Sequence, residues 1–144
     1  MAERVFKKRA VGLRAAIVRP SIIVAAKDEP FPGWTDSLAA AGGLTLSICI
    51  GLLKQIRLMD NGIIDMIPAD FCSNLILVTA AFTGLSPEPV LNIVHSSSSQ
   101  QNPLISADIP DMQVEYSCYN PWYRQVARPS CAVSTSDLMF DARD

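Results

Sequence analysis

Residues Leu13–Pro20 read LRAAIVRP, and this stretch decides the fold class. The run is short, mostly apolar and ended by a proline, as expected for a parallel strand that is covered on both faces. It follows Ala2–Arg9, a segment of good helix formers, and Gly12, which can end a helix. A helix, a glycine and a buried strand in succession are typical of an α/β fold.

A second apolar stretch predicts a buried helix. Leu44–Ile56 is apolar around most of a helical circumference, and Lys54 and Arg57 come near its negative end, where cations are favourable. Asp60–Gly62 reads DNG, which is typical of a turn. The charge-free part covers about ten residues, against the roughly 20 that a bilayer span needs, so we expect no transmembrane segment in this chain.

The α/β alternation continues downstream. Ile63–Ile67 is strand-like, and Asp70 is placed to cap a helix from Phe71 to about Phe82. Val90–Val94 then predicts another buried strand. Strands and helices thus follow one another as a parallel sheet requires.

The residues after Val94 differ in character. Ser96–Gln101 reads SSSSQQ, a polar low-complexity link, and we expect the compact part to end there. Beyond it, prolines divide the chain into pieces too short for a core, at Pro103, Pro110, Pro121 and Pro129. We predict one domain over residues 1–101 and a poorly ordered segment over residues 102–144.

The composition argues against several classes of function. The 12 basic and 14 acidic residues give a net charge of −2, which argues against nucleic acid as a partner. The four cysteines stand apart without a Cys-x-x-Cys pair, and His95 is the single histidine. We therefore expect no metal site and no disulfide framework, and a reducing compartment. No secretory signal stands at Met1–Ala10, so we expect a cytosolic start.

Three sequence words, in order, resemble the alcohol-forming fatty acyl-CoA reductases, also called the male-sterility family. They are IVRPSI at Ile17–Ile22, EPFPGW at Glu29–Trp34 and DMIPAD at Asp65–Asp70. The resemblance is firm over residues 14–94. It continues weakly beyond residue 102, which is similar to the linker towards the family's carboxy-terminal sterile domain.

The resemblance implies a partial Rossmann-like, doubly wound sheet that lacks its amino-terminal dinucleotide-binding strands. It implies that the intact enzyme reduces long-chain acyl-CoA to a fatty alcohol with NADPH. The family's Gly-rich turn and Tyr-x-x-x-Lys pair are absent from this sequence, so we expect no catalytic residue here and no turnover by this chain alone. Pro110 interrupts a segment that is helical in relatives.

Pro20, Ser21 and Ile22 are the expected cofactor contacts. In the family's fold the chain leaving this strand passes the nicotinamide, and Pro20 fixes φ so that the backbone of the next two residues can face the carboxamide. The alternative is a strand end followed by an ordinary loop.

Glu29, Phe31 and Trp34 are the expected substrate contacts. Two prolines and a glycine rule out regular structure in this segment and hold the aromatic side chains out, where they can line an acyl or pantetheine channel. The alternative is that Trp34 fills the core.

Two other functions remain open. One is a non-catalytic remnant or interaction subunit that buries an exposed sheet edge against a protein partner. The other is an epimerase-like or steroid dehydrogenase-like member of the wider fold, which leaves EPFPGW unexplained. For the intact family protein we expect the cytoplasmic side, with association with peroxisomal or endoplasmic reticulum membranes as an option.

Overall fold

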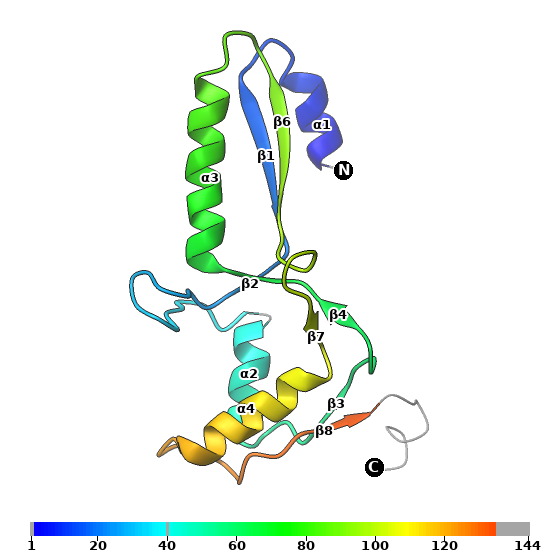
Figure 1. The fold of residues 1–144 in the computed structure, drawn as a ribbon, viewed down its shortest axis with the longest axis vertical. Coiled ribbons are helices and arrows are strands. Elements are labelled where there is room, and N and C mark those ends of the chain that lie inside the picture. Colours follow the sequence, from blue (N-terminus) through cyan, green and yellow to red (C-terminus); the bar gives the residue numbers. More distant parts are fainter. Residues whose placement is uncertain (1, 40, 135–144) are drawn as a thin grey trace. The chain divides into compact units, whose positions relative to one another are not determined.

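A computed structural model describes residues 2–39 and 41–134 (Figure 1). Over these residues the chain is mixed α/β, with four helices and eight short strands. It divides into two compact units. The first comprises Met1–Trp34 and Met66–Ser98, and the second comprises Thr35–Asp65 and Ser99–Asp144.

The first unit is built on two parallel strands that are far apart in the sequence. β1 (Ala15–Pro20) pairs with β6 (Leu91–Ser96) over six residues, in register from Ala15 opposite Leu91 to Pro20 opposite Ser96. β2 (Ile22–Val24) pairs in parallel with β5 (Met66–Pro68). The predicted α/β class is confirmed, and the parallel pairs are those of a partial Rossmann-like sheet. β6 begins one residue later and ends two residues later than predicted.

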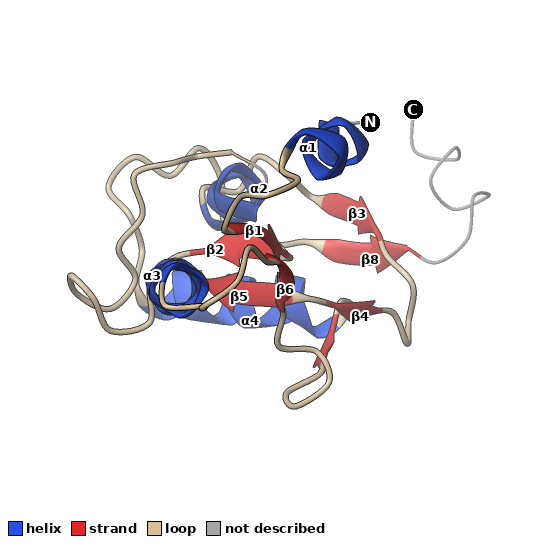
Figure 2. Cartoon of the chain, turned by 90° about the horizontal axis from the view of Figure 1, so that it is seen from above, coloured by secondary structure: helices blue, strands red, loops and turns tan. Residues whose placement is uncertain are grey.

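Helices lie on different sides of the β1–β6 pair (Figures 1 and 2). α3 (Ala69–Gly84) packs on β1, β6 and β5, and it is longer at both ends than the sequence predicts. α1 (Ala2–Arg9) has the predicted bounds, and Gly12 follows it with a φ of 81°. An ion pair between Glu3 and Arg19 joins α1 to β1, and the hydrogen bond from Arg19 lowers the pKa of Glu3.

The second unit uses shorter ladders. β3 (Gln55–Arg57) pairs in parallel with β8 (Ala132–Ser134), and β4 (Ile63–Ile64) pairs antiparallel with β7 (Leu104–Ile105). The single strand predicted at Ile63–Ile67 is therefore wrong, because Asp65 separates β4 from β5. The predicted turn before it is confirmed, since the Gly62 N–H donates to the Met59 carbonyl at 3.2 Å.

The predicted helix over Leu44–Ile56 is wrong at its carboxyl end. α2 spans Ala41–Cys49, and Gly51 follows with a φ of 79°, which turns the chain out of the helix. The Ile50 carbonyl then accepts hydrogen bonds from the N–H groups of Val126 and Ala127, at 2.9 and 3.2 Å, which replaces helical pairing. Lys54 therefore stands outside the helix.

Residues 104–134 contain more regular structure than their prolines suggest. α4 (Asp108–Tyr119) packs against α2, and Gln113 Nε2 donates to Thr45 Oγ1 at 2.7 Å. The prediction that Pro110 interrupts a helix is wrong. Pro110 is the third residue of α4, where a missing N–H costs nothing because first-turn N–H groups have no helical acceptor. Residues 135–144 of the predicted tail lie outside the described residues.

Candidate functional site

The loop that follows β2 and runs to Trp34 has a fixed shape. The Ala26 N–H donates to the Trp34 carbonyl and the Gly33 N–H donates to the Ala26 carbonyl, both at 2.9 Å. The Trp34 N–H also donates to the Phe31 carbonyl at 3.1 Å, and Gly33 has a φ of 83°, where glycine is favoured. The predicted ordered loop is confirmed.

The carboxylate of Asp70 fixes the start of this loop to α3. Asp70 Oδ2 accepts hydrogen bonds from the N–H groups of Asp28 and Glu29, at 2.9 and 3.3 Å, and Oδ1 accepts one from Lys27 at 3.1 Å. Oδ1 also accepts the N–H of Phe71 at 3.1 Å. These bonds, that of Asp28 foremost, lower the pKa of Asp70 from 3.8 to about 2.

The prediction that Asp70 is the amino-terminal cap of the helix is therefore wrong. Pro68 occupies the cap position, and Asp70 is the second residue of α3. Its carboxylate accepts hydrogen bonds from backbone N–H groups that lie about 40 residues earlier in the sequence. An aspartate before an apolar helix signals a cap, and no local pattern could have pointed to the loop instead.

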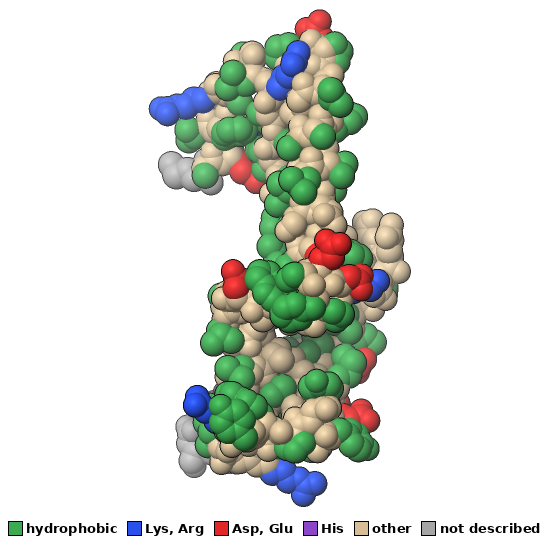
Figure 3. Space-filling model, turned by 90° about the vertical axis from the view of Figure 1, so that its left-hand side faces the viewer, with side chains coloured by type: hydrophobic (Ala, Val, Ile, Leu, Met, Phe, Trp, Pro, Cys, Tyr) green, Lys and Arg blue, Asp and Glu red, His purple; other side chains and the backbone are tan. Residues whose placement is uncertain are grey.

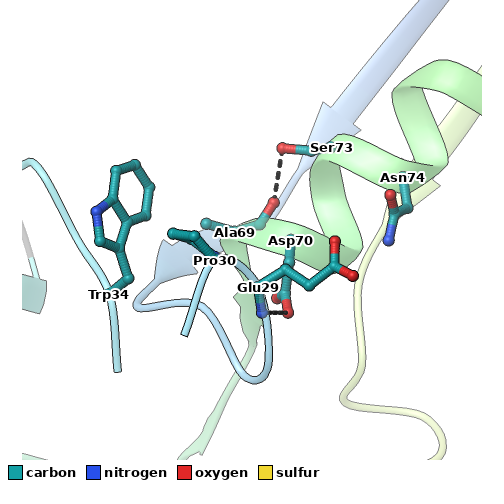
Figure 4. A pocket seen from close by; sticks show the side chains of 7 residues that line it. All are labelled: Glu29, Pro30, Trp34, Ala69, Asp70, Ser73 and Asn74. Carbon is teal, nitrogen blue, oxygen red and sulfur yellow. Dashed lines mark hydrogen bonds between the residues drawn. The ribbon is translucent and has the colours of Figure 1, made fainter. Parts of the chain in front are cut away.

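A cavity of about 330 Å³ lies where the loop meets the first turns of α3 (Figure 4). The carboxylate of Glu29 extends past Asp70 towards Asn74 in this view, and the indole of Trp34 lies on the opposite side. The lining residues are Glu29, Pro30, Trp34, Ala69, Asp70, Ser73 and Asn74. Polar and aromatic groups thus converge on one small cavity, as in sites that orient a ligand.

The structure brings together two of the three residues predicted to contact substrate. Glu29 and Trp34 line the cavity. Phe31 does not belong to the lining, and 59% of its surface is exposed. The other wall is supplied by four residues of α3 that sequence reasoning did not assign to a site: Ala69, Asp70, Ser73 and Asn74.

The three residues predicted to contact the cofactor lie at the carboxyl end of β1 and the start of β2. The Ser21 N–H donates to the Ser96 carbonyl at 2.9 Å and so continues the β1–β6 ladder. The Ser21 hydroxyl is buried and has no hydrogen-bond partner within residues 2–39 and 41–134. A buried hydroxyl without a partner is costly, so turning the Ser21 side chain towards a polar group of a ligand would relieve that cost. Pro20 and Ile22 are exposed on either side.

A second cavity of about 390 Å³ lies between α3 and the end of β6. Its walls are mainly apolar, and His95, Ser96 and Ser97 form the polar side; the other lining residues are Ile67, Phe71, Asn74, Leu75 and Val78. His95 Nε2 lies 3.3 Å from Arg19 Nη1, within unit 1. Asn74 lines both cavities.

Metal and disulfide chemistry find no support in the part of the chain that is described. No group of three or more potential ligands gathers there. Cys49, Cys72, Cys118 and Cys131 are free thiols. None of the described helices has the length and apolar character to cross a membrane.

Comparisons with known proteins agree with the three sequence words. The profile of an NAD-binding domain described as male sterility protein matches residues 1–76. Human "Fatty acyl-CoA reductase 1" is 29% identical over 140 residues, which are 97% of this chain and 27% of the human protein. Arabidopsis thaliana "Probable fatty acyl-CoA reductase 5" is 33% identical over 121 residues, covering 84% of this chain and 24% of that protein.

A third relative also carries the name of a fatty acyl-CoA reductase. Mouse "Fatty acyl-CoA reductase 2" is 36% identical over 103 residues, which are 72% of this chain and 20% of the mouse protein. The chain therefore spans about a quarter of the length of the curated relatives that it matches. The match to the family profile covers β1, β2 and β5 of the first unit and all residues that line the cavity beside Trp34, and it ends within α3, before β6.

Proposed function

Because the chain belongs to the male-sterility family of fatty acyl-CoA reductases, we propose that it is the carboxy-terminal half of a reductase domain that converts long-chain acyl-CoA to fatty alcohol with NADPH. The observation that carries this proposal is the buried, unpartnered hydroxyl of Ser21 at the carboxyl end of β1. Ligands of open α/β sheets bind at the carboxyl ends of the strands, so a polar group of the cofactor belongs there.

Pro20, Ser21 and Ile22 would hold the nicotinamide end of the cofactor. The Ser21 N–H is already used by Ser96, so the Ser21 hydroxyl would join the backbone of Ser21 and Ile22 in binding a carboxamide. Pro20 has no N–H and fixes the backbone before Ser21. The bound cofactor would supply the hydride, and these residues would set its position.

Glu29, Phe31 and Trp34 would form the wall against the acyl or pantetheine part of the substrate. The cavity beside Glu29 and Trp34 is of the size that small-molecule sites have, about 300 to 1,000 Å³, and its mixed lining suits a chain with both amide and methylene groups. Phe31 is exposed and available to contact a longer ligand.

The chain supplies only part of the machinery. Its sequence has no Gly-x-Gly-x-x-Gly turn and no tyrosine four residues before a lysine, so a pyrophosphate turn and a general acid must come from elsewhere. We assign residues 1–101 to the reductase half and residues 102–144 to the linker towards a sterile domain. Cytoplasmic exposure with attachment to a peroxisomal or endoplasmic reticulum membrane belongs to the intact protein in this proposal.

The alternative is a non-catalytic remnant or subunit that covers an open sheet edge with a protein partner. In the described residues, β1 has β6 as its single ladder partner, and residues on alternate positions of β1 direct their backbone groups away from β6. An open edge of this kind invites an added strand.

The test combines this chain with the amino-terminal half of the human relative's reductase domain and follows NADPH consumption and fatty alcohol from palmitoyl-CoA. We expect no turnover by either part alone, turnover by the mixture, and a loss of about tenfold or more in the affinity for NADPH on Ser21→Ala. Leu77→Ser, on the outer side of α3, is the control. A mixture that associates but stays inactive would favour the non-catalytic alternative.

A further inference from the structure

We propose that Asp70 is the positioning residue of the substrate cavity, because its carboxylate holds the backbone of Lys27–Glu29 and thereby sets the loop that carries Glu29 and Trp34. This inference rests on the proposed function, since it concerns the same cavity. It assigns Asp70 no contact with reacting atoms.

The geometry is that of an anion bound by consecutive backbone N–H groups. Three successive residues of the loop direct their N–H groups to one carboxylate, at 3.1, 2.9 and 3.3 Å. Such a concave run of N–H groups is an anion site in many proteins, and here a side chain of the same chain fills it. Charge-assisted bonds of this kind are stronger than neutral ones.

The bonds are well placed to control the cavity. Glu29 takes part twice, because its N–H binds Asp70 and its side chain lines the cavity (Figure 4). Asp70 itself lines the cavity next to Glu29. A shift of the loop start therefore changes the distance between the loop wall and the α3 wall, which Ser73 and Asn74 form.

The other contact between the start of the loop and α3 is weaker than the bonds to Asp70. Lys27 Nζ lies 5.5 Å from the ring centroid of Phe71, a cation–π distance. This contact joins an exposed lysine to an exposed ring and is weak in water. Within the described residues, the carboxylate of Asp70 is the group that draws several loop amides to α3 at once.

The test uses the whole chain and starts without any ligand. In Asp70→Ala we expect hydrogen exchange of the Lys27, Asp28 and Glu29 amides to become about tenfold faster or more, since each loses a bond to a charged acceptor. Sodium acetate should slow exchange again by filling the vacated anion site, while sodium chloride at equal ionic strength should not. Asn74→Ala, one turn along α3 in the same cavity wall, is the matched control and should leave these amides unchanged.

The second readout is the KM for palmitoyl-CoA in the active mixture with the amino-terminal half. We expect Asp70→Ala to raise KM about tenfold with little change in kcat, and acetate to restore KM. Unchanged exchange in Asp70→Ala overturns the proposal, and so does faster exchange with an unchanged KM. Faster exchange that acetate reverses, in a wild-type mixture that forms no alcohol, would support the role of Asp70 in the loop and count against the reductase function alone.

Discussion

In the first unit β1 and β6 pair over six residues, whereas the ladders of the second unit pair over two or three residues each. The first unit can therefore distribute its stability along a regular ladder and a long helix. The second depends on a few closely packed positions, such as Ile48 in α2 and Gly51 after it. The comparison teaches that the loss of one residue should matter more in the second unit than in the first.

The largest loss of stability is expected for Ile48→Ala in the second unit, and this variant is the strongest test of the comparison. Ile48 has none of its surface exposed, and it lies on α2, which packs on α4. Removing its buried methyl and methylene groups should lower the free energy of unfolding by about 2–5 kcal/mol. Urea unfolding followed by the fluorescence of Trp122, with Trp34 replaced by Phe, measures it. Ile63→Ala is the control of the same type, because Ile63 is 63% exposed in the same unit and should cost little.

The next largest effect is expected for Gly51→Ala, which should lower the free energy of unfolding by about 2–4 kcal/mol. Alanine at a φ of 79° is strained, and a Cβ there would also overlap the backbone of Ala127. Gly12 separates the two causes, because it has a φ of 81° with nothing within 4 Å of a built Cβ. Gly12→Ala should therefore cost only the strain, about 1–2 kcal/mol. Equal losses in the two variants would show that the contact with Ala127 adds nothing.

The same contrast explains what could be predicted from the sequence. The strand predicted at Leu13–Pro20 and the turn at Gly12 follow from residues next to one another, and the structure has the turn and a strand that begins two residues later, at Ala15. The end of α2 does not, because the Ile50 carbonyl accepts hydrogen bonds from Val126 and Ala127, which a helical pattern cannot include. Short ladders are set by such distant partners and leave little periodicity to detect.

The candidate site shows the same division. The loop Glu29–Trp34 was predicted to be ordered because its prolines and glycine restrict the backbone locally. The part of Asp70 was missed, because a helix-start aspartate has a local explanation and the competing N–H groups of Lys27–Glu29 lie far away in the sequence. The prediction of a cofactor contact at Ser21 came from the family's sequence words, whereas the unpartnered hydroxyl of Ser21 could only be seen in the fold.

The next effect is a pH dependence of the first unit. Asp70 has a pKa of about 2 in the folded chain, against 3.8 for the free group, so its ionised form is favoured by folding. The stabilisation is complete above pH 3.8 and is lost as the pH falls towards about 2. Exchange of the Lys27–Glu29 amides, corrected for the intrinsic pH effect, should rise in that window. Asp70→Asn should remove this dependence, and a persistent rise in that variant would assign it to another group.

The smallest expected effect is that of Leu77→Ser on the outer side of α3. Hydrophobic side chains stay on the molecular surface (Figure 3), and 68% of the surface of Leu77 is exposed. Because a side chain so exposed gains little from folding, the free energy of unfolding should change by no more than about 0.5 kcal/mol. Ile67→Ser, at a buried position of β5 in the same unit, should cost several times more. A loss above about 1 kcal/mol at Leu77 that grows with protein concentration would mean that another molecule covers α3 in solution, and the first unit would then owe part of its stability to association.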